Sequence, residues 1–160
     1  MKEINTGTSA FIFQDIDELP AVDKNLMEAA IQAAKNAYAP YSGFSVGAAL
    51  LMDDNSIIIG NNQENAAYPS GMCAERVAIW KAGSSYPNKK VKKIAITAVS
   101  SNKKLDKPVG PCGACRQTLL EYEVNQKEAM EIFFMGEIGT VVKANSIVSL
   151  LPFSFDSSYL

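Results

Sequence analysis

The stretch PCGACRQ, Pro111 to Gln117, places two cysteines three positions apart, directly after a proline. The proline and the run behind it predict a helix from about Gly113 to Glu123, with both thiols at its start. The chain of 160 residues contains one further cysteine, Cys73, and no histidine. A metal or redox site that uses these two thiols can therefore include only one further cysteine.

Cys73 opens a second predicted helix, CAERVAIWKAG, which we expect to end at Gly83. The N-terminus of a helix presents free N–H groups and the positive end of the helix dipole. Both effects stabilise a thiolate and lower the pKa of a thiol. Two such helix starts that face each other would bring three thiolates together. Zinc accepts three protein ligands in catalytic sites and keeps a fourth position for water.

Other interpretations of the cysteines remain open on this pattern alone. A C-x-x-C pair in a cytosolic protein is also typical of a redox pair or of half a structural zinc site. A cysteine at a helix start is often only a small buried residue. A closed structural zinc site would need a fourth cysteine or histidine, and the sequence has neither. A carboxylate would have to complete it, so an open site is the simpler interpretation.

Composition bounds the class of protein. With 20% charged and 48% hydrophobic residues the chain resembles an ordinary globular protein, and its length predicts one domain. The net charge of −2 argues against a nucleic acid polymer as partner. No apolar run reaches the roughly 18 residues of a membrane span, and the first residues lack the pattern of a secretory signal. We therefore expect a cytoplasmic protein with reduced thiols and no membrane partner.

Helical and strand patterns alternate along the chain. A helix is predicted from Asp23, interpreted as its N-cap, to a stop at Pro40. The other predicted elements are strands over 44–52, 56–61, 91–100, 130–135 and 140–144 and a last short helix over 145–151. The acids in Glu121–Phe133 are interpreted as lying on solvated faces or strand edges. The stretch AFIF, residues 10–13, is expected to add an edge strand, to cover the core or to lie in an interface.

These elements predict an α/β or α+β fold with one mixed sheet of about five strands, covered by helices on both faces. Residues 1–22 are predicted to form an N-terminal arm. Residues 23–160 are predicted to form a single domain.

Glu75 lies two residues after Cys73, in the first turn of the same predicted helix. An acid at this position is common because it complements the helix dipole. Beside an open zinc position, a carboxylate can instead carry protons between water, substrate and leaving group.

Three motifs carry a resemblance to a known family. They are YSGFSVGAALL (41–51), NNQENAAYPSGMCAERVAI (61–79) and PCGACRQTLLE (111–121). Together they resemble the small homotetrameric cytidine deaminases in which all zinc ligands are cysteines. The resemblance extends over about 26–155. It implies a three-layer α/β/α fold, a homotetramer and zinc-dependent hydrolytic deamination of cytidine and deoxycytidine in pyrimidine salvage.

The resemblance also implies roles for residues at the zinc centre. Cys73, Cys112 and Cys115 would bind one zinc ion per subunit, and Glu75 would be the proton shuttle. Arg76 would donate to the cysteine sulfurs and offset their negative charge. Arg116 is a weaker candidate for that role, since an exposed ion pair in the helix suits it equally.

Further roles concern the nucleoside. The backbone N–H of Ala74 and the backbone near Ala66 would hold the pyrimidine 2-carbonyl. Asn62 and Glu64 would hydrogen-bond the ribose 3′-hydroxyl, and Phe44 would pack against the nucleoside. Phe155 would reach the site of a neighbouring subunit, whereas Phe153 is expected to fold back on its own subunit.

Four other functions compete with this one. Blasticidin S deaminases share the cysteine and glutamate pattern but not the N-x-E-N stretch at Asn62–Asn65. A free-base deaminase has no use for residues that bind ribose. A polynucleotide deaminase needs a basic and aromatic surface. A non-catalytic zinc module would require an acid such as Glu75 to close the site.

Overall fold

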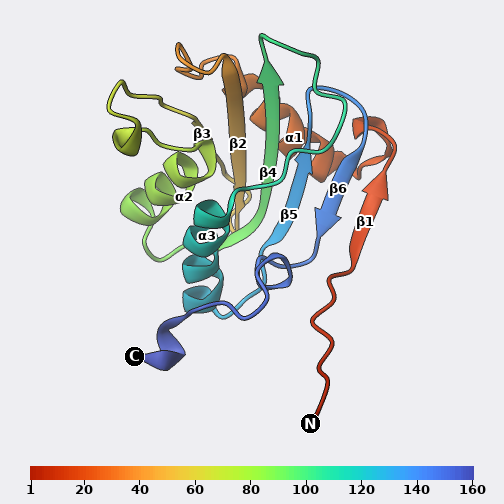
Figure 1. Ribbon diagram of the computed structural model, residues 1–160, viewed down its shortest axis with the longest axis vertical. Helices are drawn as coiled ribbons and strands as arrows, with labels where there is room; N and C mark the ends of the chain where they lie inside the picture. The colour runs from red at the N-terminus through yellow and green to blue at the C-terminus, as the bar shows by residue number, and fades with distance from the viewer.

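The computed structural model of the chain, which describes residues 1–160, has one sheet of six strands between two layers of helices (Figure 1). The strands are β1 (Ala10–Phe13), β2 (Phe44–Met52), β3 (Ile57–Asn61), β4 (Val91–Ser100), β5 (Glu131–Met135) and β6 (Val141–Ala144), and the helices are α1 (Ala21–Ala34), α2 (Ala74–Ser85) and α3 (Gly113–Gln126). The strand order is β1-β6-β5-β4-β2-β3. Helix α1 lies behind the sheet in Figure 1, and α2 and α3 lie in front of it.

The sheet is mixed. β4 and β5 pair in parallel, while all other neighbouring strands pair antiparallel. The parallel pair requires a crossover, which α3 supplies between β4 and β5. The predicted three-layer α/β/α fold is confirmed.

The strand β2 shows why both faces of the sheet are covered. Ala48 and Leu50 belong to the core under α2 and α3, whereas Ala49 and Leu51 belong to the core under α1. Successive side chains of a strand point to opposite faces, so an almost uninterrupted apolar strand needs a helical layer on each side. None of the helices has the length and apolar character that a bilayer-spanning segment requires.

The sixth strand comes from the N-terminal segment. β1 pairs antiparallel with β6, with Ala10 opposite Ala144 and Phe13 opposite Val141. Of the three possibilities for AFIF, the edge strand is therefore the one observed. It raises the strand count from the predicted five to six.

Three predicted helix boundaries were wrong. The N-cap of α1 is Pro20, and Asp23 lies in the first turn, where its buried carboxylate forms an ion pair of 2.6 Å with Lys93 of β4. The helix ends at Ala34, well before Pro40. Likewise, Gly83 does not end α2. It lies within the helix, at a point where α3 comes close: a Cβ there would lie 2.6 Å from the Tyr122 hydroxyl.

The predicted helix over 145–151 is reduced to a short 3-10 turn, Val148–Leu150. Its position is set by Glu123 of α3, whose buried carboxylate accepts hydrogen bonds from the backbone N–H groups of Met130 (2.7 Å), Ile147 (2.8 Å) and Val148 (3.0 Å). The interpretation of Glu123 as a solvated acid was therefore wrong. This carboxylate connects α3 to both segments that follow it.

Candidate metal centre and pocket

The two cysteine-bearing helices begin side by side. Cys73 is the N-cap of α2 and Cys112 is the N-cap of α3, so both predicted helix starts are confirmed within one residue. Gly60 of β3 permits this placement, since a Cβ there would lie 2.6 Å from the carbonyl oxygen of Ala74. The first turn of α2 thus rests directly on the backbone of β3.

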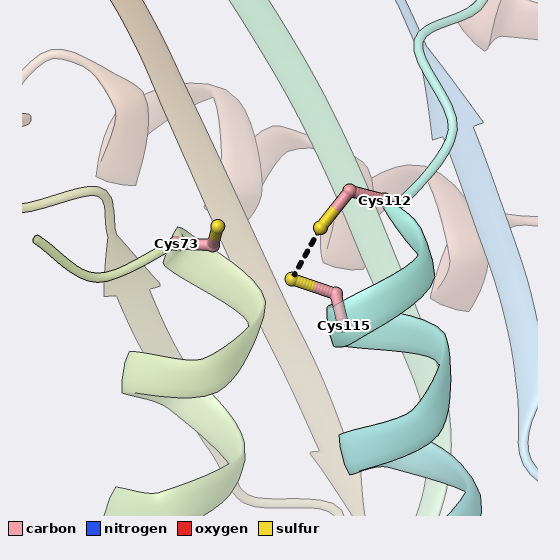
Figure 2. A group of neighbouring side chains, drawn as sticks. All are labelled: Cys73, Cys112 and Cys115. Atoms are coloured by element: carbon pink, nitrogen blue, oxygen red, sulfur yellow. Dashed lines mark hydrogen bonds between the residues drawn. The ribbon is translucent and has the colours of Figure 1, made fainter. Parts of the chain in front are cut away.

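The three thiols converge at these helix starts. Figure 2 shows the sulfurs of Cys112 and Cys115 facing each other at the start of α3, with Cys73 at the start of the neighbouring α2. The three Sγ atoms all lie within 4.8 Å of one another, and those of Cys112 and Cys115 are 3.5 Å apart. Cys115 is buried, whereas Cys112 is exposed.

This geometry suits a tetrahedral metal ion with soft ligands. Zinc–sulfur bonds of about 2.3 Å at tetrahedral angles place sulfur atoms about 3.8 Å apart. The Cys112–Cys115 separation is close to that value, and no two of the three sulfurs are more than 4.8 Å apart. No histidine exists in the chain, and no other group of three ligand residues converges. Three thiolates with one open position are therefore what this cluster offers.

The environment of the cluster favours a thiolate at Cys73. A hydrogen bond from Cys115 and the neighbouring Arg76 guanidinium lower the pKa of the Cys73 thiol to about 5. The same hydrogen bond, together with burial, raises the pKa of Cys115. A divalent cation that binds all three sulfurs as thiolates displaces the protons that these thiols still carry.

Arg76 supplies the positive charge next to the sulfurs. Its Nη2 donates to Cys73 Sγ at 3.4 Å, and its guanidinium lies 5.9 Å from the centre of the Trp80 ring. The Nε atom of Arg76 is buried and has no hydrogen-bond partner. A guanidinium held this way offsets part of the charge of three thiolates.

Glu75 is the one acid next to the cluster. Its side chain is buried, with a relative exposure of 5%, and it lines the pocket described below. Burial raises the pKa of the Glu75 carboxyl, and the charge of Cys73 raises it further. A carboxyl whose two protonation states lie closer in free energy near neutral pH is suited to taking up and releasing protons.

A pocket of about 770 Å³ opens beside the cluster. Such a volume is typical of sites for small molecules. Of the residues predicted from the sequence, its lining contains Phe44, Asn62, Glu64, Cys73, Glu75, Arg76 and Cys112. It also contains Tyr41, Ser42, Tyr68, Met72, Val109 and Gly110, which the sequence analysis did not single out.

Comparison with known proteins identifies the family. Residues 20–130 match the family described as "Cytidine and deoxycytidylate deaminase zinc-binding region". The chain belongs to this family. A cytidine deaminase of Halalkalibacterium halodurans is 42% identical over 130 residues, which cover 81% of this chain and 91% of that protein. A cytidine deaminase of Sporosarcina psychrophila is 37% identical over 146 residues, which cover 91% of this chain and 95% of that protein.

Solved structures agree with this assignment. The crystal structure of a cytidine deaminase from Burkholderia pseudomallei superimposes with a TM-score of 0.70 at 38% identity, and the match covers 82% of this chain and 97% of that one. The family match and the converged sulfurs together confirm the predicted cofactor: Cys73, Cys112 and Cys115 form a zinc-binding cluster.

Two predicted nucleoside contacts are already hydrogen-bonded to the protein. Asn62 Oδ1 accepts from the N–H of Val46 at 2.7 Å, and its Nδ2 donates to the carbonyl of Phe44 at 2.8 Å. Glu64 accepts hydrogen bonds from the loop that contains Tyr41 and Ser42. Both side chains are thus held in place in the pocket wall. Each still has a hydrogen-bonding position that no protein group occupies and that a ligand can use.

Other predicted residues lie outside the pocket lining. Ala74 is buried, and as the first residue of α2 its N–H has no partner within the helix. Ala66 is exposed, in the segment that precedes α2. Cys115 lies behind the pocket wall.

The C-terminal tail lies against α3 rather than in the pocket. Arg116 donates to the carbonyls of Pro111 (2.9 Å) and Leu150 (2.8 Å), so it is neither an exposed ion pair nor bonded to a sulfur. Gln117 Nε2 donates to the Phe155 carbonyl at 2.8 Å. The Phe155 ring stacks on Tyr159 but is 58% exposed. Phe153 is 80% exposed, so the expectation that it folds back on its own subunit was wrong.

Proposed function

We propose that this protein is a zinc-dependent deaminase that converts cytidine and deoxycytidine to uridine and deoxyuridine with release of ammonia. The observation that carries the proposal is the buried Glu75 beside a three-thiolate cluster, both opening into one pocket. The cytidine deaminases found among its relatives support the choice of substrate. Glu64 in the same pocket offers an acceptor for a sugar hydroxyl.

Zinc bound to the three cysteines lowers the pKa of water and so supplies a nucleophile at neutral pH. Glu75 takes a proton from the attacking water and delivers it to ring N3 of the pyrimidine, while the oxygen bonds to C4. Glu75 then transfers the second proton to the amino nitrogen. The C4–N bond breaks and ammonia leaves, so that one water is consumed for each ammonia released.

The remaining residues hold the nucleoside for this chemistry. Phe44 offers an apolar surface to the ring, and the unpaired N–H of Ala74 and the backbone near Ala66 can hold the 2-carbonyl. Asn62 and Glu64 face the sugar. Arg76 and the two helix N-termini offset the negative charge of the thiolates, which keeps the metal acidic.

Two broader expectations belong to this proposal. The three cysteines are all free, which suits a reducing cytoplasm. Residues 23–160 form the catalytic domain, and the arm of residues 1–22 adds β1 to its edge.

A substrate panel tests the function. We expect purified protein with one zinc per chain to deaminate both cytidine and deoxycytidine, followed as loss of absorbance in the cytosine band. Cytidine 3′-phosphate is expected not to react, because the anionic Glu64 repels a phosphate at that position. No turnover of cytidine by the zinc-loaded protein would refute the proposal and favour a non-catalytic zinc module. Efficient deamination of single-stranded DNA would show that the substrate class is wrong.

The proposal extends to a homotetramer in which Phe155 covers the substrate of a neighbouring subunit. The exposure of Phe155 and its absence from the lining of its own pocket support this role. An exposed phenylalanine ring leaves well over 100 Å² of apolar surface in water. A neighbouring subunit would bury that surface and complete the pocket wall.

Complementation tests the shared site. One inactive variant is Glu75→Ala with an intact tail, and the other is Phe155→Ala with an intact Glu75. Refolded together with zinc, they should form pockets with both residues, and random mixing of equal amounts restores about a quarter of the wild-type sites. A Phe153→Ala partner in place of Phe155→Ala serves as the control for a tail residue without this role. If the mixture is only as active as its components, Phe155 acts within its own chain.

A further inference from the structure

One wall of the pocket is built on the carboxylate of Glu64. Its Oε2 accepts hydrogen bonds from the backbone N–H groups of Tyr41 (2.9 Å) and Ser42 (3.3 Å). Its Oε1 accepts a hydrogen bond from the Ser42 hydroxyl. A carboxylate offers about four acceptor positions. Three are occupied by this loop, which leaves one on Oε1.

The Ser42 hydroxyl also has a second partner. Its oxygen accepts the backbone N–H of Phe44 at 3.0 Å, so its one proton is committed to Glu64. The carbonyl of Ser42 accepts from Asn102 Nδ2 at 3.3 Å, which connects the loop to the end of β4. One hydroxyl group thus joins the carboxylate of Glu64 to the backbone of Phe44, and all three residues line the pocket.

We propose that Ser42 is a positioning residue for sugar recognition: it fixes the Glu64 carboxylate so that the remaining acceptor position on Oε1 meets the 3′-hydroxyl of the nucleoside. The inference rests on the proposed function and deepens it. Ser42 need not touch the substrate. It sets the orientation of a group that does, and so it favours sugars that carry a hydroxyl donor there.

The charge of Glu64 agrees with this role. The hydrogen bond from Ser42, followed by that from the Tyr41 backbone, lowers the pKa of the Glu64 carboxyl below its ordinary value. Glu64 is therefore an anion at neutral pH and can only accept hydrogen bonds. A rotating carboxylate would meet the hydroxyl in a fraction of its orientations, whereas one held at three points is already oriented.

The test compares two substrates in the zinc-loaded enzyme. Ser42→Ala removes the hydroxyl but keeps the backbone N–H groups. For cytidine we expect kcat/KM to fall roughly 10-fold, as for the loss of a hydrogen bond to a charged group. For 2′,3′-dideoxycytidine, which has no 3′-hydroxyl to present, we expect a fall of less than about 2-fold.

Three further variants make the result specific. Ser42→Thr keeps the hydroxyl at an exposed position and should restore the activity on cytidine. Ser101→Ala is the matched control, since Ser101 contacts the same loop through its backbone N–H to the Gly43 carbonyl while its hydroxyl faces Asn102. In a Glu64→Gln background, Ser42→Ala should add little to the loss already present.

Equal losses on both substrates would overturn the proposal, because Ser42 would then act on the loop as a whole. No loss on cytidine, or a full additional loss in the Glu64→Gln background, would overturn it as well. Zinc content and thermal unfolding of each variant, measured alongside, separate these outcomes from a folding defect. Failure of the proposed function gives a different result, since the wild-type protein would then not turn over cytidine at all.

Discussion

Glu75→Gln is expected to abolish turnover while zinc stays bound. The amide has nearly the shape of the carboxyl group, so the 5% exposed side chain keeps its packing. The three sulfur ligands are unchanged. The variant lacks only a group that can accept a proton from water and pass it on. The fall in kcat should be at least roughly 10²–10⁴, the usual contribution of general acid–base catalysis.

Three measurements establish this result. Turnover of cytidine gives the loss in kcat, metal analysis shows that zinc remains stoichiometric, and equilibrium binding shows that cytidine still enters the pocket. Glu121→Gln is the matched control, because it makes the same change at an exposed acid of α3. Near-normal activity of Glu75→Gln would mean that another group carries the protons.

Much of the fold could be predicted because its signals are local. The later strands are mostly apolar runs between turn residues, and β2 is apolar on both faces, which requires two helical layers. β1 could not be assigned in the same way. Four residues with no polar alternation fit an edge strand, a cover or an interface equally, and only the pairing with β6 decides between them.

Charged residues show the limit of sequence patterns more clearly. The sequence pattern predicts an N-cap role for Asp23 and a solvent-exposed position for Glu123 on α3. Both are buried because of partners far away in the sequence: Lys93 for Asp23, and the backbone of Ile147 and Val148 for Glu123. A carboxylate can be buried only where such partners exist, and the sequence does not show which segments will meet.

The metal centre was more predictable than the pocket wall. With three cysteines and no histidine, the choice of ligands was nearly forced. For the part of the pocket that would hold the sugar, the sequence did not restrict the choice of residues in this way. Ser42 directly precedes a glycine, and such a pair is typical of an ordinary turn. Its hydrogen bond to Glu64 depends on a contact between two loops about twenty residues apart in the sequence.

Cys112→Ala is expected to remove the metal and most of its contribution to stability. Cys112 is exposed, so its truncation leaves no cavity in the core, whereas truncation of the buried Cys115 would do so. The effect of Cys112→Ala therefore reports on the metal rather than on packing. Two remaining sulfurs bind zinc far more weakly than three, because ligands on adjoining helix starts act together.

The measurement is thermal unfolding with and without added zinc, with metal content determined on the same samples. A ligand present at about 1,000 times its Kd stabilises the folded state by about 4 kcal/mol. Zinc should therefore raise the Tm of the wild-type protein clearly and that of Cys112→Ala little, and the variant should be inactive on cytidine. Gly113→Ala is the matched control at the same helix start, because a Cβ there meets no atom within 4 Å and every ligand is kept. Stoichiometric zinc in Cys112→Ala, or a zinc-dependent Tm equal to that of the wild type, would exclude Cys112 as a ligand.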